Sequence, residues 1–254
     1  MISAWLGAIA IGLSLGLLGS GGSIVTVPVL VYLFGQDEKV AIAGSLAIVG
    51  TIALAASLPY MRRGYVDWRN VMVFGLPGML GTYLGAWLAA FVSGLVQLSL
   101  FALVMLAAAV LMLRPMRIDD APHVPRATWK IAVDGLLVGV VTGLVGVGGG
   151  FLIIPALVLL GGLRMHNAVA TSLVIIALKS YSGFYKYLEV LAGQDLALDW
   201  QVIALVTTLG VAGSLAGNLL ATRLPHQLLK RIFGIFLVMM GCYILVRSLP
   251  QLVT

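Results

Sequence analysis

Long apolar segments separated by short polar turns fill this chain almost from end to end. In the first half they cover about residues 2–18, 24–34, 40–61, 71–92 and 95–113. In the second half they cover about residues 131–145, 151–161, 167–188, 201–222 and 228–248. Four segments in each half approach the roughly 17–25 residues with which an α-helix spans a bilayer. The pattern therefore predicts a bundle of membrane helices.

The composition narrows the class of protein further. Of the 254 residues, 61% are hydrophobic and 9% are charged, and the mean hydropathy is +1.11. A soluble domain carries about a quarter charged residues. The net charge of +6 comes from basic residues near the predicted helix ends, so it does not indicate nucleic-acid binding. The single cysteine, Cys242, excludes an internal disulfide and a cysteine-based metal cluster. We therefore expect an all-α, multi-pass integral protein of the cell (inner) membrane.

The two halves of the chain repeat each other with an offset of 127 residues. The matching positions of the first half are Gly12, Gly16, Gly19, Gly21, Gly22 and Pro28, which fall on Gly139, Gly143, Gly146, Gly148, Gly149 and Pro155. After a five-residue insertion, Asp67-Trp68 meets Asp199-Trp200. We expect a first membrane repeat at residues 1–113, a cytoplasmic linker at 114–129 and a second membrane repeat at 130–254.

The basic residues favour an inverted arrangement of the two repeats. If each glycine-rich segment dips into the membrane and returns, one side receives Arg62, Arg63, Arg69, Arg114, Arg117, Arg126, Lys130, Arg164, Arg223, Lys230 and Arg231. The other side keeps only Lys39, Lys186 and Arg247. If those segments cross fully, the repeats are parallel and the basic residues divide more evenly. The positive-inside rule thus favours two inverted repeats, each with one re-entrant glycine-broken helix and three transmembrane helices.

Two glycine clusters break otherwise apolar helices at equivalent places. They comprise Gly19, Ser20, Gly21, Gly22 and Ser23 in the first half and Gly146, Gly148, Gly149 and Gly150 in the second. Each glycine costs a helix of order 1 kcal/mol relative to alanine, so we expect the helices to open there. Opened backbone inside a membrane has to line a cavity or lie buried in protein. Paired breaks whose following helices offer free N–H groups are typical of a secondary transporter for an anion.

Other readings of the glycines explain less. Small-xxx-small spacing at Gly12/Gly16, Gly81/Gly85, Gly135/Gly139/Gly143 and Gly213/Gly217 indicates helix packing. A phosphate-binding loop would need a preceding strand and a Lys-Ser/Thr pair, which are missing. A nucleophilic serine would need a base, but His123, His166 and His226 fall in predicted cytoplasmic loops. An intramembrane enzyme is therefore disfavoured.

One charge, Lys179, falls well inside a predicted membrane helix. Either its long side chain reaches back to the outer interface, or the ammonium lines the translocation path. In the second case, polar residues that would complete the anion site are Ser45, Thr171, Ser172 and Asn218. Asn218 could equally serve helix packing. We expect the site to need no metal and no cofactor.

The chain resembles the TauE/SafE family of sulfite exporters and sulfonate-permease-like proteins over its whole length. The segment GVGGGFLIIP (146–155) matches the family pattern, whereas GSGGSIVTVP (19–28) has Ser23 in place of a third consecutive glycine. The resemblance implies transport of sulfite, sulfonate, thiosulfate or a similar small anion, driven by a coupled proton or other ion or by the substrate's own gradient. A passive anion channel is the alternative. The anion, the direction of transport and the oligomeric state stay open.

Overall fold

The computed structural model describes residues 7–9, 11–13, 21–113, 127–159, 163–221 and 226–253, which form helices and contain no strand. The first half contains η1 (Gly21–Val25), α2 (Thr26–Tyr32), α3 (Glu38–Arg62), α4 (Trp68–Asn70), η2 (Val71–Gly75), α5 (Leu76–Leu88), η3 (Ala89–Phe91) and α6 (Gly94–Leu113). The second half contains α7 (Thr128–Val145), α8 (Gly150–Leu159), α9 (Met165–Ala192), α10 (Trp200–Ala221) and α11 (His226–Val253). The predicted all-α fold is confirmed.

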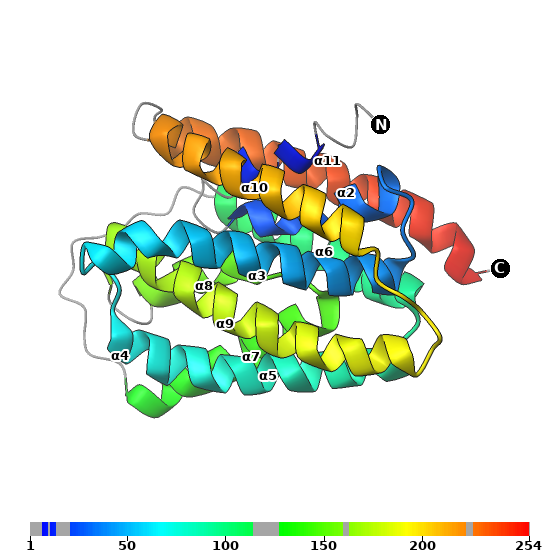
Figure 1. Ribbon diagram of the computed structural model, residues 1–254, viewed down its shortest axis with the longest axis horizontal. Coiled ribbons are helices and arrows are strands. Elements are labelled where there is room, and N and C mark those ends of the chain that lie inside the picture. The colour runs from blue at the N-terminus through cyan, green and yellow to red at the C-terminus, as the bar shows by residue number, and fades with distance from the viewer. Residues whose placement is uncertain are drawn as a thin grey trace.

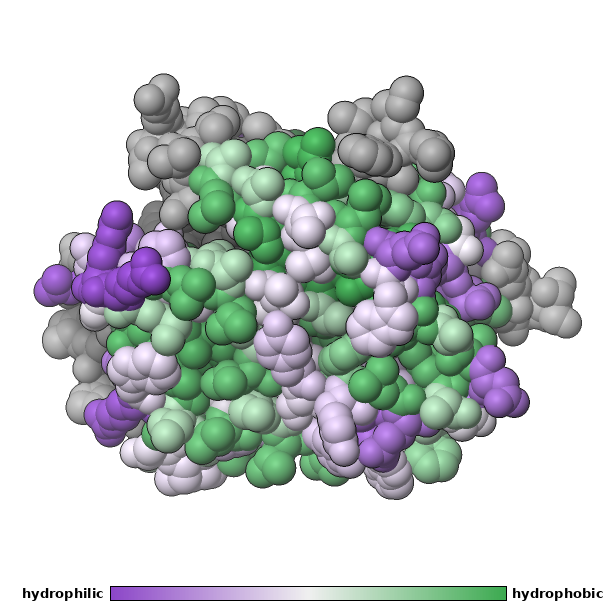
Figure 2. Space-filling model, viewed as in Figure 1, coloured by the Kyte–Doolittle hydropathy of each residue, from purple (hydrophilic) through white to green (hydrophobic). Residues whose placement is uncertain are grey.

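Five stretches among the described residues are long and apolar enough to cross a membrane. They are Glu38–Arg62, Trp68–Phe91, Thr128–Val145, His166–Ala192 and Trp200–Gly217. Shorter apolar stretches lie at Ser23–Tyr32, Gly94–Val110 and Gly234–Ser248. Figure 2 shows a broad hydrophobic belt between two more hydrophilic ends. This surface suits a bundle whose helices run through lipid.

The repeated Asp-Trp pairs form the starts of equivalent helices. Asp67 Oδ1 accepts a hydrogen bond from the N–H of Asn70 at 3.0 Å. Asp199 Oδ1 accepts from the N–H groups of Gln201 and Val202, each at 3.0 Å. A carboxylate at this position satisfies N–H groups that the helix leaves free. The aspartate of each Asp-Trp pair thus caps a helix.

The equivalent helices α3 and α9 run in opposite directions through the middle of the bundle (Figure 1). Along this contact, Gly50 packs on Ser180, while Leu46, one turn earlier in α3, packs on Gly183. By contrast, α5 runs in the same direction as α9, because Gly75 contacts Ile175 and Thr82 contacts Gly183.

Helix α7 also runs in the same direction as α5. Gly135 packs on the carbonyl of Phe74, and Gly143 packs two turns later on Thr82. Since α7 and α9 share this direction, the chain between them, including α8, leads back to the end at which α7 begins. At that end, the ring of His166 lies 4.5 Å from the ring of Tyr65. Arg164 therefore lies at the same end of the bundle as Arg62.

Glycines bring helices of different halves into backbone contact. A Cβ atom on Gly139 of α7 would lie 2.4 Å from the carbonyl oxygen of Gly78 of α5. A Cβ atom on Gly12 would lie 2.3 Å from the carbonyl oxygen of Gly210 of α10. Gly12 is the repeat mate of Gly139, and Gly210 is the repeat mate of Gly78, so the two crossings are equivalent. The packing role predicted for these small-residue patterns is confirmed at Gly12, Gly81, Gly85, Gly135, Gly139, Gly143 and Gly213.

Candidate functional site

The helix break of the second half lies between α7 and α8. Gly146 has a left-handed backbone with φ of +74°. Its N–H and that of Val147 both donate to the carbonyl oxygen of Thr142, at 2.9 and 3.1 Å. Glycine ends helices in this way because it lacks a Cβ atom. Gly149 also has a positive φ, +71°, and α8 begins at Gly150. The predicted opening of the helix at this cluster is confirmed.

The break is packed tightly against α3 of the other half. A Cβ atom on Gly146 would lie 2.1 Å from Cγ2 of Ile42. On Gly148 it would lie 2.6 Å from Cγ1 of Val49. No side chain fits at such distances, so glycine lets the opened backbone approach α3.

Ser45 of α3 provides a hydroxyl to this opened backbone. Its Oγ lies 2.7 Å from the carbonyl oxygen of Ile42 and also within hydrogen-bond distance of the carbonyl oxygen of Gly146. The single hydroxyl proton is therefore shared between the two carbonyls, and both oxygen lone pairs stay available to accept. The expected polar residue lies at the break.

Ser180 of α9 faces the same break and was not among the residues predicted from the sequence. Its Oγ lies 3.3 Å from the position that a Cβ atom on Gly148 would take. This Oγ is buried and has no hydrogen-bond partner among the described residues. The repeat mate of Ser180 is Ala53, so the comparison of the two halves gave no signal. The only sequence signal for Ser180 was its position directly after Lys179.

Lys179 itself lies on the adjacent face of α9, toward α5. A Cβ atom on Gly78 would lie 3.0 Å from Cδ of Lys179, so this glycine leaves room for the lysine stem. The side chain is 1% exposed, and its Nζ is buried without a hydrogen-bond partner among the described residues. The end of the side chain therefore does not reach the surface of the bundle. The alternative in which Lys179 reaches back to the outer interface would require it to do so.

The break of the first half is described only from Gly21 onward, and Gly19 and Ser20 lie outside the described residues. Gly21, Gly22 and Ser23 form the 3₁₀ helix η1 instead of the expected open backbone. Such a tighter turn is common at the start of an α-helix, which here is α2. Ser23 is buried, and Thr26 Oγ1 is buried without a partner among the described residues. Because η1 contacts α8, the segments that follow the two breaks meet.

Three further predicted residues are not brought to the break by any described contact. Thr171 Oγ1 accepts a hydrogen bond from the N–H of Asp67 at 3.0 Å, which ties it to the loop between α3 and α4. The hydroxyl of Ser172 donates to the carbonyl oxygen of Val169 at 2.8 Å. The backbone of Asn218 lies in α10, but its side chain lies outside the described residues.

Two buried side chains hold the end of α7 just before the break. Gln97 Nε2 donates to the carbonyl oxygen of Leu144 at 2.7 Å and to the hydroxyl of Tyr187 at 2.9 Å. The Tyr187 hydroxyl in turn donates to the same Leu144 oxygen at 3.2 Å. Because α7 ends at the break, no further helical turn offers N–H groups to its last carbonyl oxygens. The side chains of Gln97 and Tyr187 supply donors in their place.

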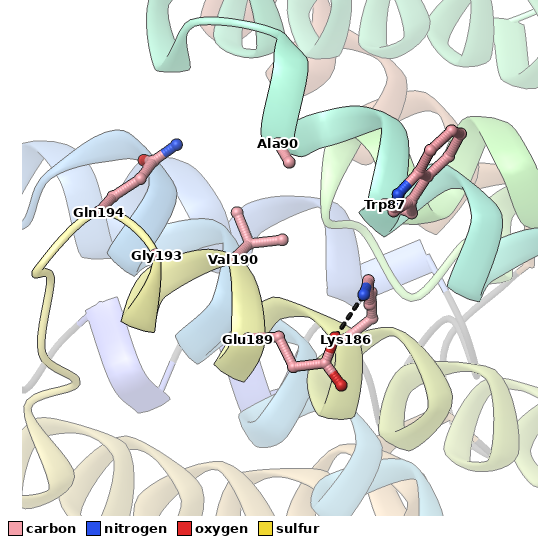
Figure 3. Close-up of a pocket in the computed structure, with 7 residues that line it drawn as sticks. All are labelled: Trp87, Ala90, Lys186, Glu189, Val190, Gly193 and Gln194. Atoms are coloured by element: carbon pink, nitrogen blue, oxygen red, sulfur yellow. Dashed lines mark hydrogen bonds and ion pairs between the residues drawn. The ribbon is translucent and has the colours of Figure 1, made fainter.

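An open pocket of about 380 Å³ lies away from the break, between the ends of α5 and α9 (Figure 3). Trp87, Lys186, Glu189 and Gln194 contribute to its lining, and Lys186 forms an ion pair with Glu189. Because its charges neutralise each other, this pocket lacks the uncompensated charge expected of an anion site.

The electrostatics around the break favour a negatively charged ligand. No Asp or Glu is buried among the residues whose burial is described, whereas Lys179 is. The dipole of α8 adds roughly half a positive charge at the start of this helix, at Gly150. Within the same part of the chain, no three His, Cys, Asp or Glu residues come together as a metal site would require. The arrangement can hold a small anion by hydroxyls, backbone N–H groups and one ammonium group.

Known proteins resemble the chain over nearly its whole length. The model of the family described as sulfite exporter TauE/SafE matches residues 4–244. A "probable membrane transporter protein" of Xylella fastidiosa (strain 9a5c) is 35% identical, over 96% of this chain and 94% of its own. The "probable membrane transporter protein YunE" of Bacillus subtilis (strain 168) is 30% identical, over 90% and 91%. No solved structure matches the chain significantly.

Proposed function

The chain belongs to the sulfite exporter TauE/SafE family of membrane transporters, and from this premise we propose that it carries a small sulfur-containing anion. Sulfite, thiosulfate and sulfonates are the substrate classes that we infer. The protein works as a secondary transporter, because its sequence contains no nucleotide-binding motif. It works in the cell (inner) membrane.

The substrate site of this proposal lies where the two helix breaks meet. The break at Gly146–Gly150, the hydroxyls of Ser45 and Ser180 and the ammonium group of Lys179 surround it, and Ser23 of the other break completes it. The observation that carries the proposal is a pair of buried polar atoms without hydrogen-bond partners among the described residues: Ser180 Oγ beside the opened backbone, and Lys179 Nζ on the adjacent face of α9. Leaving such groups unpaired destabilises the fold, so their presence indicates a ligand.

Inverted repeats are part of the same proposal. The opposite directions of the equivalent helices α3 and α9 support it, as does the return of the chain between α7 and α9. Arg62 and Arg164 then share the cytoplasmic side, where basic residues are enriched. Two related halves packed around a central site can expose it alternately to either side.

Counterflow in proteoliposomes tests the function. Vesicles containing the protein are loaded with unlabelled sulfite, thiosulfate, methanesulfonate or chloride and diluted into the labelled anion. We expect transient, saturable accumulation with at least one of the three sulfur anions and none with chloride or in protein-free vesicles. Flux that never saturates would indicate a passive channel, and the lack of flux with all three anions would contradict the substrate class.

A further inference from the structure

Lys179 carries an ionisable amine in the middle of a membrane helix, without a hydrogen-bond partner among the described residues. It lies about 21 Å along α9 from Met165, at 1.5 Å per residue. Its Nζ is buried and forms no hydrogen bond among the described residues. A charge inside a membrane is strongly destabilising unless it is paired.

The elements packed against α9 offer no counter-charge in contact with this amine. Their titratable or charged residues, on α3, α5 and α7, are Glu38, Lys39, Tyr60, Arg62, Tyr83, Lys130 and Asp134. Those of α9 itself are His166, Tyr181, Tyr185, Lys186, Tyr187 and Glu189. The half-buried Asp134 precedes Gly135, which packs on the same helix α5. Lys179 Nζ forms no hydrogen bond with any of these groups.

We propose that Lys179 is the proton-binding site of the transporter, so that each transported anion crosses the membrane together with one proton. This rests on the proposed function. In the empty protein, burial without a counter-charge keeps the side chain as a neutral amine. When an anion enters beside Ser180, the amine nitrogen takes up one proton and becomes the ammonium group that the anion needs. Anion binding and proton binding then strengthen each other reciprocally.

The geometry places the two ligands next to each other without a shared face. Ser180 points to the break at Gly148, whereas Lys179 points to Gly78 of α5. Consecutive side chains of a helix diverge by about 100°, so the two groups lie on adjacent faces of α9. Their opposite charges attract each other through the protein interior, where the dielectric constant is low. Release on the other side is reversed: the anion leaves, and the ammonium group returns its proton to water.

A proton-flux measurement tests the coupling. Vesicles with a trapped pH indicator receive thiosulfate or methanesulfonate, which stay ionised, or sulfite, under an imposed inward proton gradient. We expect one proton to enter per anion and the gradient to drive accumulation of the anion at least fivefold. The Lys179→Met variant keeps the length of the side chain without the amine, so the accumulation should be lost. The Lys186→Met variant, on the same helix at the open pocket between the ends of α5 and α9, should behave as the wild type.

Two outcomes would overturn the proposal while leaving anion transport intact. One is anion flux in the wild type without proton uptake. The other is a combined result: the Asp134→Asn variant loses proton uptake, while the Lys179→Met variant keeps full proton-driven accumulation. This combination would place the proton on the Asp134 carboxylate. A third outcome, no flux of any of the three anions in the wild type, would remove the proposed function and the coupling with it. Folding of each variant is checked by its elution as a single species in detergent.

Discussion

Ser45 of α3 shares its hydroxyl proton with the carbonyl oxygen of Gly146, 101 residues away in the other half of the chain. A helix of the first repeat thereby holds the opened backbone of the second. The bond also satisfies a carbonyl that no following turn of helix can satisfy. The site is thus built jointly by both halves.

Replacing Ser45 by alanine should weaken both the fold and transport. The buried Gly146 carbonyl loses the donor that the structure shows, which costs about 1–3 kcal/mol. Thermal unfolding in detergent should begin at a lower temperature, and saturable flux should fall severalfold. Ser57→Ala, on the same helix, removes a buried hydroxyl whose hydrogen-bond partners, Leu54 and Met61, both lie in α3, so it should change flux little. Unchanged stability and flux in Ser45→Ala would contradict the role of this bond.

Gly146 and Gly64 provide a matched pair for the shape of the break. Both have a positive φ, +74° and +71°, but only Gly146 has neighbours at the position of a Cβ atom. Gly64→Ala should lower the free energy of unfolding by the backbone term alone, about 1–2 kcal/mol. Gly146→Ala adds overpacking against Ile42, typically about 1–3 kcal/mol more, and should abolish transport. Equal effects of the two substitutions on unfolding would show that α3 does not confine the break.

Gln97 and Tyr187 should act as one unit on the end of α7. Each donates to the carbonyl oxygen of Leu144, and Gln97 also donates to Tyr187. In a double-mutant cycle with Gln97→Leu and Tyr187→Phe, we expect a coupling energy of about 0.6 kcal/mol, the average for polar contacts between membrane helices. The cycle is measured by unfolding in detergent. Strictly additive effects would mean that the two side chains hold α7 independently.

Thiol labelling can test the direction of the repeats. In a Cys242→Ser background, cysteine replaces the exposed residues Asp37, Arg63 or Arg164 one at a time. A membrane-impermeant maleimide added to intact cells should label only Asp37→Cys. Arg63→Cys and Arg164→Cys should react only after the membrane is opened, because both lie at the other end of the bundle. Labelling of Arg164→Cys and Asp37→Cys from the same side would contradict the inverted arrangement.

The sequence predicted the helices and the second break because both depend on local patterns. The length of each apolar segment determines a helix. The clustered glycines end α7 whichever helix packs against it. The partner of each glycine stripe could not be predicted, since small residues at helical spacing define a face without naming the helix that covers it. Gly139 contacts Gly78 of the other half because α7 packs along α5, a pairing that no local pattern specifies.

The polar residues of the site were harder to predict than the glycines. Ser180 was missed because its repeat mate is alanine, and only the folded chain places its hydroxyl beside Gly148. Thr171 carried the expected chemistry, but the N–H of Asp67 occupies its hydroxyl oxygen. For Lys179 the sequence left two directions open, and the choice depends on the space that Gly78 leaves on a neighbouring helix.

Counterflow with the Ser180→Ala variant tests the central claim, that the anion binds at the break between α7 and α8. Ser180 Oγ has no partner in the described structure, so its removal breaks no bond and should not lower the unfolding temperature. A hydrogen bond to a charged ligand contributes about 1.5–3 kcal/mol, so flux at low anion concentration should fall roughly tenfold or more. Ser57→Ala, at another buried serine that bonds to its own helix, should transport as the wild type does. Wild-type flux in Ser180→Ala would contradict an anion site at this break.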